Sequence, residues 1–479
     1  MSSSNKNLNI YNSLSSQKEV FNSINKNVVG MYVCGPTVYN TVHLGNCRTF
    51  VSFDLIFRYL KHLGYKVRYV RNITDVGHLE DDTQEDKISK RAALEKLEPM
   101  EIVQKYTNDF RNTLQKFNLL NPNIEPTATG HIIEQIEMIE KIIDNGFAYV
   151  KNGSVYFDIK EFNKKYKYGK LSNRNLDDLI NESRQLKGSD EKKNPQDFAL
   201  WKKAGKKHIM KWNSPWGEGF PGWHIECSAM GHKYLGKQFD IHGGGIDLKF
   251  PHHDCEIAQS ESVYGNNPAN YWIHTNMLTL NGKKMSKSLG NSVFPNEIFY
   301  GSNKAFSKKF SPMTLKFFMY QAHYRNTLDI SNDALLAAEK GFQKIKNLNE
   351  EISAIYESKK NDFNASAWVN ECYDALNDDF NSPKLIAKLF DLHKTVIEIK
   401  NKTKSIDSKN KKILLKFYKI FYAEILGLDD DSSSNEKFDE ILELILELRE
   451  KERLSKNYDK SDYIRDKLNE LGLKINDKI

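Results

Sequence analysis

VVGMYV, residues Val28–Val33, is a short apolar run that ends at a Gly-Pro turn, a pattern typical of a buried strand. After it, apolar side chains recur at helical spacing between Gly45 and Leu63, and Gly64 is well placed to end that helix. Residues 66–73, KVRYVRNI, are rich in Val, Tyr and Ile and predict a second strand. Strand, helix and strand in this order form a βαβ unit. The sequence therefore predicts a parallel sheet of the nucleotide-binding kind.

Residues 118–222 have a different pattern, which predicts an α+β insertion. An amphipathic helix over residues 131–146 leads into a hairpin pattern around the pair Asn152-Gly153. A charged stretch over residues 181–195, NESRQLKGSDEKKNP, is typical of a loop. Parallel-sheet signals resume with FDIHGGG at Phe239–Gly245, so we expect the insertion to split the sheet.

From about Met313 to the end, the pattern is helical. The expected fold is therefore α/β, with a Rossmann-type parallel sheet split by an α+β insertion and followed by a helical C-terminal region. The expected divisions are 1–117 and 223–275 for the two halves of the sheet domain, 118–222 for the insertion, 276–320 for a lysine-loop region, 321–428 for a helical bundle and 429–479 for a helical tail.

Composition bounds the class of protein. With 28% charged and 39% hydrophobic residues, the 479-residue chain has ordinary globular usage, and its length allows two to four domains of ~100–200 residues. The net charge of +7 permits a polyanionic partner, although basic and acidic residues balance over residues 401–479. No apolar run is long enough for a membrane span or a signal peptide, so we expect a cytoplasmic protein without membrane contact.

The five cysteines are odd in number and widely spaced, which favours reduced thiols or metal ligands over a disulfide framework. They are Cys34, Cys47, Cys227, Cys255 and Cys372.

Residues 282–291 read GKKMSKSLGN, a cluster of lysines with too few apolar side chains to pack against a core. Lys284 and Lys287 fit either a solvated lysine loop or a loop that neutralises the charge of a triphosphate during phosphoryl or adenylyl transfer. TVHLGN, residues 41–46, lies where the first strand turns into the helix. His43 there fits either ordinary helix capping or the binding of a phosphate at the helix N-terminus.

A third set of residues has the chemistry of metal ligands. Cys34 follows the first strand, Cys227 lies in PGWHIECSAM, and His252 and Glu256 are four residues apart, hence on one face of a helix. Each also has a simpler interpretation as a buried thiol or a solvated helix start. A zinc site would have to be assembled from these distant segments.

Taken together, six motifs resemble the cysteinyl-tRNA synthetases, a class I aminoacyl-tRNA synthetase family. In chain order they are MYVCGPTVYNTVHLGN, NITDVGHL, SPWGEGFPGWHIECSAM, FDIHGGGIDLKFPHHDCEIAQ, GKKMSKSLGN and NDDFNSPKLIAKLF. HLGN is similar to the family's HIGH signature, and KMSKS to its mobile ATP loop. The resemblance spans almost the whole chain.

The resemblance implies a role for each candidate residue. The implied catalytic residues are His43, Lys284 and Lys287; the ATP-binding residues are Thr41, His43, Asn46, His242, Asp247 and Lys287; the cysteine-binding residues are Thr74 and Trp223; and the zinc ligands are Cys34, Cys227, His252 and Glu256. One Zn²⁺ per chain would select the substrate thiol, because zinc binds thiolate far better than a hydroxyl. Two departures from the family pattern are Asp254 and Cys255, beside the implied zinc ligands, and an acidic insertion over residues 77–87.

The implied activity is that of a cysteine–tRNA ligase. It would activate L-cysteine with ATP and Mg²⁺ to cysteinyl-adenylate, releasing pyrophosphate, and then transfer cysteine to the 3′-terminal adenosine of tRNA(Cys). The region over 276–320 would contact the tRNA stem and residues 429–479 its anticodon, and the family is usually monomeric. Two alternatives are a cysteine ligase with an amino-sugar acceptor, which would lack a long helical tail, and a non-catalytic tRNA-binding scaffold, in which the phosphate-handling motifs would be damaged.

Overall fold

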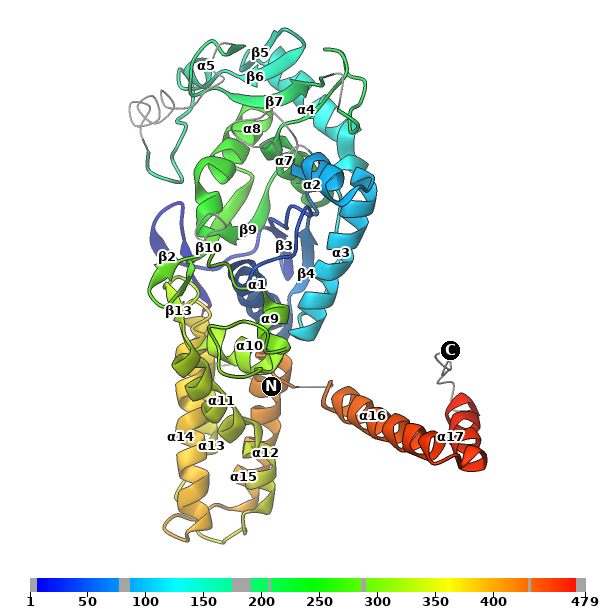
Figure 1. The fold of residues 1–479 in the computed structure, drawn as a ribbon. Coiled ribbons are helices and arrows are strands. Elements are labelled where there is room, and N and C mark those ends of the chain that lie inside the picture. Colours follow the sequence, from blue (N-terminus) through cyan, green and yellow to red (C-terminus); the bar gives the residue numbers. More distant parts are fainter. Residues whose placement is uncertain are drawn as a thin grey trace. The chain divides into compact units, whose positions relative to one another are not determined.

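The computed structural model describes residues 7–76, 87–174, 191–205, 208–285, 290–429 and 432–470 (Figure 1). These form two compact units, Met1–Leu428 and Asp429–Ile479. Three sequence predictions lie wholly or partly outside the described residues: the acidic insertion over 77–87 except for Lys87, residues 181–190 of the charged loop over 181–195, and the centre of the lysine loop, 286–289, with Lys287.

A four-stranded parallel sheet lies at the centre of the first unit, with strand order β10-β9-β3-β4. Its strands are β3 (Val28–Val33), β4 (Lys66–Arg71), β9 (Phe239–Gly245) and β10 (Ala269–Thr275). Met31, Tyr32 and Val33 of β3 pair with Ile241, His242 and Gly243 of β9. Since β9 and β10 follow the insertion in sequence, the prediction of a split Rossmann-type sheet is confirmed.

Helix α1 (Leu44–His62) joins β3 to β4 and packs on the sheet. It begins at the N-cap His43, and Gly64, with φ of 91°, follows its C-cap Leu63 as predicted. Phe53 of α1 packs so closely on β9 that a Cβ atom at Gly243 would lie 2.0 Å from the ring. The run of glycines in β9 therefore allows the helix to approach the sheet.

The insertion forms a second sheet, antiparallel and in the order β5-β6-β7-β8. Asn152 and Gly153 both have positive φ in the β5–β6 turn, which confirms the predicted hairpin. Its buried side chains, among them the fully buried Phe157 and Trp201, form a core separate from that of the parallel sheet. The elements of residues 87–264 are α2 (Lys87–Glu95), α3 (Pro99–Lys116), η1 (Thr129–His131), α4 (Ile132–Asp144), β5 (Ala148–Lys151), β6 (Ser154–Phe157), α5 (Ile159–Phe162), β7 (Phe198–Lys203), β8 (Gly219–Pro221), α7 (Trp223–Leu235), η3 (Ile246–Leu248), η4 (Lys249–His253) and α8 (Asp254–Tyr264).

A three-stranded sheet links the parallel sheet to a helical bundle (Figure 1). In it, β11 pairs with β12 in a hairpin and with β13, which follows helix α10. The elements are β11 (Leu278–Leu280), β12 (Lys283–Lys284), α9 (Pro295–Phe299), α10 (Pro312–Tyr320), β13 (Leu328–Ile330), and the bundle helices α11 (Asn332–Lys346), α12 (Leu348–Ala354), α13 (Ala365–Asn377), α14 (Ser382–Lys400), α15 (Ser408–Lys419) and η5 (Ile420–Ile425). A short N-terminal hairpin, β1 (Asn9–Asn12) and β2 (Gln17–Val20), packs beside β10.

The second unit contains α16 (Ser432–Leu454) and α17 (Tyr458–Glu470), which pack on each other. The prediction of a helical C-terminal region is thus confirmed. Among the described helices of both units, none has the length and apolar character that crossing a bilayer requires.

A buried group of charges joins the end of the bundle to α1. Lys316 Nζ lies 3.1 Å and Arg58 Nε 2.7 Å from Asp54 Oδ2, and Lys316 also donates to the carbonyl of Gly427 at 3.1 Å. Burial lowers the pKa of Lys316 to about 8. Gly427 has φ of 58°, and a Cβ atom there would lie 2.7 Å from the Arg58 guanidinium and 2.8 Å from Lys316 Nζ. This junction thus needs glycine for both conformation and space.

We expect Gly427→Ala to destabilise the protein more than Gly64→Ala. Both residues have positive φ, so each substitution costs roughly 1–2 kcal/mol of backbone strain. A Cβ at Gly64 meets nothing within 4 Å, whereas one at Gly427 displaces two buried charges, and about 3 kcal/mol or more is expected there. Thermal melting of both variants would measure the difference, and equal shifts in Tm would contradict this account of the junction.

Candidate functional site

The carboxyl ends of the parallel strands and the N-terminus of α1 surround a cavity of about 460 Å³. Seven residues predicted from the sequence line it: Cys34, Thr41, His43, Asn46, Trp223, Asp247 and Lys284. Ligands of open α/β sheets bind at this edge, where free strand ends and a helix N-terminus meet. The cavity is thus the candidate active site.

His43 both caps α1 and lines the cavity. Its Nδ1 accepts a hydrogen bond from the backbone N–H of Asn46 at 3.3 Å, and the Asn46 side chain accepts from the backbone N–H of His43 at the same distance. Because Nδ1 is an acceptor, the neutral ring carries its hydrogen on Nε2. A Cβ atom at Gly45 would lie 3.0 Å from the imidazole, so the glycine of HLGN leaves room for the ring. The arrangement suits contact with an anion at the helix N-terminus.

The four predicted metal ligands come together. The ligand atoms of Cys34, Cys227, His252 and Glu256 all lie within 4.8 Å of one another, and all four side chains are buried. The two sulfur atoms are 3.9 Å apart, and His252 Nε2 lies 3.1 Å from Glu256 Oε1. Cys34 follows β3, Cys227 belongs to α7, and the other two flank the start of α8. Two thiols, one imidazole and one carboxylate are a donor set that fits a four-coordinate zinc ion.

Two of the four groups, Cys227 and Glu256, have pKa values lowered toward the anionic form that binds a metal ion. A hydrogen bond from Cys34 lowers the pKa of Cys227 to about 6, while burial raises the pKa of Cys34. Burial would also raise the pKa of Glu256, but the charges of His242 and His252 lower it to about 2. His252, although buried, has its pKa raised to about 10 by hydrogen bonds to Cys227 and Glu256. A bound metal would replace the protons on His252 and Cys34.

His242 does not line the cavity with Thr41, His43, Asn46 and Asp247, the other predicted ATP-binding residues that the structure describes. Its ring is buried, stacks on Trp272 with centroids 4.4 Å apart, and places Nε2 2.8 Å from Glu256 Oε2. His224 similarly contacts Nδ1 of His252 at 2.9 Å, on the side of the ring away from Glu256. Both histidines are therefore placed to orient candidate ligands, as the outer partners of metal ligands do.

Sequence reasoning missed His253. Its Nε2 lies 3.4 Å from Cys34 Sγ, and its Nδ1 is 2.8 Å from His274 Nε2. Cys34, His242, His253 and Glu256 form a second compact set of possible ligands. The set with two thiols is chemically better for zinc, which leaves His253 as a neighbour of Cys34. The adjacent pair His252-His253 in FPHHDCEIAQ was the signal that could have identified it.

The two predicted cysteine-binding residues are placed differently. Trp223 lines the cavity at the start of α7, with its ring centroid 4.6 Å from that of His252. Thr74 is buried behind the cavity wall, where its hydroxyl donates to Glu226 Oε2 at 3.0 Å and accepts from Asn72 Nδ2 at 3.1 Å. Of these two predicted cysteine-binding residues, only Trp223 lines the cavity.

Asp254 and Cys255, which depart from the family pattern beside the candidate metal ligands, have structural roles. Cys255 is buried in the core of the insertion, with Sγ 3.3 Å from the hydroxyl of Tyr168. Asp254 accepts hydrogen bonds from the backbone N–H groups of Leu171 and Ser172. Cys255 thus belongs to neither group of possible ligands.

Two family descriptions match the chain. Residues 20–340 match "tRNA synthetases class I (C) catalytic domain", and residues 371–428 match "DALR domain". A protein of Phocaeicola vulgatus named cysteine–tRNA ligase is 51% identical over 478 residues, 98% of this chain and 97% of its own. A protein of Chlorobaculum tepidum with the same name is 45% identical over 485 residues, with the same coverage of both chains.

Solved structures are similar in fold. Methionyl-tRNA synthetase of Mycobacterium tuberculosis bound by methionyl-adenylate has a TM-score of 0.61 at 12% identity, over 83% of this chain and 92% of that chain. A leucyl-tRNA synthetase from Agrobacterium radiobacter, in a ternary complex, has a TM-score of 0.58 at 10% identity, over 84% and 85%. At these identities the likeness concerns the fold alone.

We expect Cys227→Ser to lower zinc affinity at least about a hundredfold, because an uncharged hydroxyl replaces a thiolate donor. Cys255→Ser is the matched control, since it changes a buried thiol of the same region that lies outside the cluster. Metal analysis of both variants after dialysis against a chelator measures the effect. Equal loss of zinc from both would show that the cluster is not the binding site.

Proposed function

Because this chain belongs to the cysteine–tRNA ligase family of the class I tRNA synthetases, it is an ATP-dependent ligase that joins cysteine to tRNA, and we propose that the cavity at the ends of β3 and β9 is its active site. The observation that carries the proposal is the gathering of residues from four distant motifs on one cavity. The two matched regions span most of the chain, from the sheet to the bundle.

The reaction has two steps. The carboxylate of cysteine attacks the α-phosphorus of ATP to give cysteinyl-adenylate and pyrophosphate, and a ribose hydroxyl of the terminal adenosine of tRNA(Cys) then displaces AMP. His43, at the N-terminus of α1, would donate to the α-phosphate, with Thr41 and Asn46 beside it in the cavity lining. Lys284 and Lys287 would neutralise the charge on the leaving pyrophosphate, and Mg²⁺ would accompany ATP. Positioning and electrostatics supply the rate enhancement, without a covalent enzyme intermediate.

Selection of cysteine is assigned to Cys34, Cys227, His252 and Glu256, which would hold one Zn²⁺ at the end of the cavity. Bound there, zinc would supply a Lewis acid that binds the thiolate of cysteine far better than the hydroxyl of serine. Loss of a bond of this kind allows discrimination of ~10⁴ or more without a second editing site. Trp223 would cover the substrate from the cavity wall, and Asp247 would contact the adenylate ribose. Thr74 and His242 would act from behind the wall.

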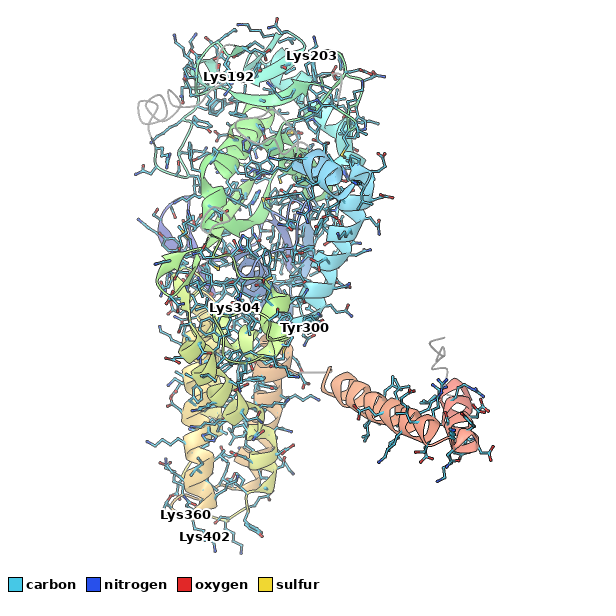
Figure 2. The ribbon with its side chains drawn as sticks, in the orientation of Figure 1. Lys192, Lys203, Tyr300, Lys304, Lys360 and Lys402 are labelled. Carbon is cyan, nitrogen blue, oxygen red and sulfur yellow. The ribbon has the colours of Figure 1, made fainter. Side chains whose placement is uncertain are left out.

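Recognition of tRNA(Cys) is proposed for the surfaces beyond the cavity. Figure 2 shows Tyr300 and Lys304 projecting from the region that follows the β11–β12 hairpin in sequence. It also shows Lys360 and Lys402 at the far end of the helical bundle. These cationic and aromatic side chains suit a phosphate backbone and unstacked bases. Residues 276–320 would contact the tRNA stem and residues 429–479 the anticodon. We further propose a cytoplasmic monomer, consistent with five cysteines that form no disulfide.

Purified protein should catalyse ATP–pyrophosphate exchange with cysteine and not with serine. The preference follows from a metal that binds sulfur, so Cys227→Ser should lose it together with zinc, while Cys255→Ser should retain both. Exchange that persists with unchanged selectivity in zinc-free protein would refute the selection mechanism. Product that forms with an amino sugar rather than tRNA would refute the assigned acceptor.

Replacement of His43 by asparagine should lower kcat for exchange by ~10²–10³ while leaving Tm little changed. Asparagine is a good N-cap residue and preserves the start of α1, but it lacks the imidazole N–H. His62→Asn makes the same substitution at the opposite end of α1, outside the cavity, and should leave kcat within about twofold. An equal loss of kcat in both variants would show that α1 is disturbed as a whole.

A further inference from the structure

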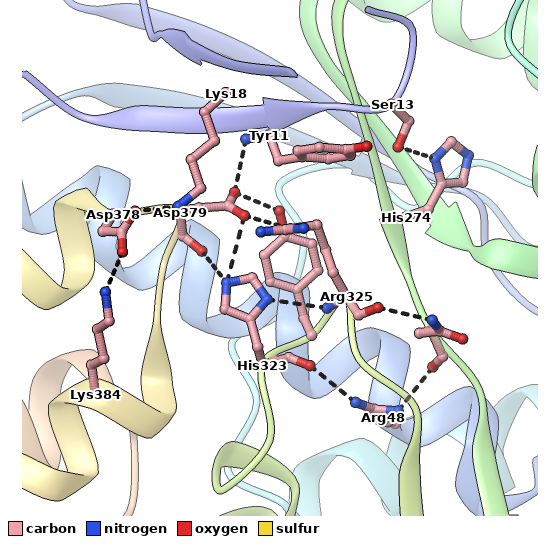
Figure 3. Close-up of polar contacts among 12 residues, drawn as sticks. Tyr11, Ser13, Lys18, Arg48, His274, His323, Arg325, Asp378, Asp379 and Lys384 are labelled. Atoms are coloured by element: carbon pink, nitrogen blue, oxygen red, sulfur yellow. Dashed lines mark hydrogen bonds and ion pairs between the residues drawn. The ribbon is translucent and has the colours of Figure 1, made fainter. Parts of the chain in front are cut away.

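A buried polar cluster lies where the N-terminal hairpin, the α10–β13 loop and the α13–α14 turn meet (Figure 3). It lies outside the cavity, and none of its side chains belongs to the candidate catalytic or metal-binding groups. Its central residues are Asp379 in the bundle, His323 and Arg325 in the loop, and Arg48 in α1. These four residues link three segments that are far apart in the sequence.

Asp379 is the centre of this cluster. Its side chain is fully buried, and Oδ1 accepts from the backbone N–H of Tyr11 at 2.9 Å and from the hydroxyl of Tyr324 at 2.6 Å. Oδ2 accepts from Nε of Arg325 at 2.6 Å. Asp379 has φ of 63° and Phe380 has φ of 54°, two consecutive non-glycine residues in the left-handed region. Such a conformation is held only where many contacts define it.

His323 connects Asp379 to the backbone of the loop. Its Nδ1 accepts from the backbone N–H of Arg325 at 3.2 Å, so the hydrogen of the neutral ring is on Nε2. Nε2 then donates to the backbone carbonyl of Asp379 at 3.1 Å. Burial lowers the pKa of His323, consistent with a neutral ring. The loop is therefore held to the bundle by both the carboxylate and the carbonyl of one residue.

Arg48 joins the same loop to the wall of the cavity. Its Nη1 donates to the carbonyls of Asn276 and Met277 at 3.0 and 2.6 Å, and its Nη2 donates to those of His323 and Asn326 at 3.2 and 2.5 Å. The guanidinium is buried, and these contacts in the described chain are to carbonyl oxygens rather than to a carboxylate. A planar guanidinium with paired donors fixes both segments in one relative position.

The position of Asn276 and Met277 matters because both line the cavity, as does Leu278, the first residue of β11. Leu278 pairs with Leu328 of β13, which follows the loop that Arg48 and Asp379 hold. Strand β11 then leads through the hairpin to Lys284, which also lines the cavity. The metal cluster lies on other elements, at the ends of β3, α7 and α8.

We propose that Asp379, acting through Arg325, His323 and Arg48, is a positioning residue that sets one wall of the cavity, Asn276 to Leu278 with the hairpin to Lys284, relative to the helical bundle. In the proposed function, Lys284 is the residue of this wall that contacts the phosphates of ATP. The inference rests on the proposed function of the cavity. It assigns to the α13–α14 turn an effect on ATP binding that is separate from the binding of cysteine. Contact of tRNA with the bundle would thereby bear directly on the geometry of the ATP site.

Asp379→Asn tests the proposal in the full-length, zinc-loaded protein. Asparagine has the same shape and also tolerates positive φ, so the substitution removes the charge that holds Arg325. ATP–pyrophosphate exchange, with ATP and cysteine varied separately, should show KM for ATP raised about tenfold and KM for cysteine within about twofold of wild type. Zinc content should be unchanged, because Asp379 contacts none of the four candidate zinc ligands, Cys34, Cys227, His252 and Glu256.

Asp378→Asn is the matched control. The neighbouring carboxylate forms ion pairs with Lys18 and Lys384 at the surface, so both KM values should stay within about twofold of wild type. Arg48→Lys, which keeps a buried cation but loses the paired donors, should reproduce the selective rise in KM for ATP.

Three results would overturn the inference: an unchanged KM for ATP in Asp379→Asn, equal rises in both KM values, or loss of folding in both Asp379→Asn and Arg48→Lys. If wild-type protein shows no exchange, the proposed function fails instead. Equilibrium binding of a non-hydrolysable ATP analogue to the same variants then tests the positioning role alone, with an unchanged Kd overturning it.

Discussion

The pairing of β3 with β9 is the interaction on which the rest of the structure depends. It joins two halves of a sheet that the insertion separates in sequence, and the backbone N–H of Cys34 extends the ladder by donating to the carbonyl of Gly243 at 3.0 Å. Through this register, the end of β3 is placed beside the residues that follow β9. Cys34 and His43 come from the first half, and His252 and Glu256 from the second. A shift of one residue would turn every side chain of the shifted strand to the opposite face and separate the candidate ligands.

The sequence predicted those parts of the fold that depend on local pattern. The β3–α1–β4 unit, the Asn152-Gly153 hairpin and the helical C-terminal region follow from periodicity and turn chemistry, and all are confirmed. The candidate site was accessible only through motifs, because its residues are hundreds of positions apart. The pair His252-His253 marks His253 as a possible ligand, but neither its contact with Cys34 nor the contact of Asp379 with Arg325 can be predicted from the local sequence. His242 had a motif, but its burial against Trp272 depends on β9 and β10 lying side by side.

Charges, as well as apolar side chains, join the sheet domain to the bundle. Lys316 with Asp54 and Arg58 forms one buried junction, and Asp379 with Arg325 forms another. Buried ion pairs add little net stability, but removing one partner is costly because it leaves the other charge buried alone. Such contacts therefore favour one relative arrangement strongly over its neighbours. The two junctions therefore hold the bundle in one position relative to the cavity of the sheet domain.

The position of the insertion between the donor segments has a consequence for the integrity of the chain. A break anywhere in residues 118–222 would leave Cys34 on one fragment and Cys227, His252 and Glu256 on the other. The two fragments would also share the central sheet, with β3 and β4 on one and β9 and β10 on the other. A metal ion held by all four side chains would then bridge two separate polypeptides. Reassembly of such a split protein would depend on the metal, as a two-chain complex depends on its bridging ligand.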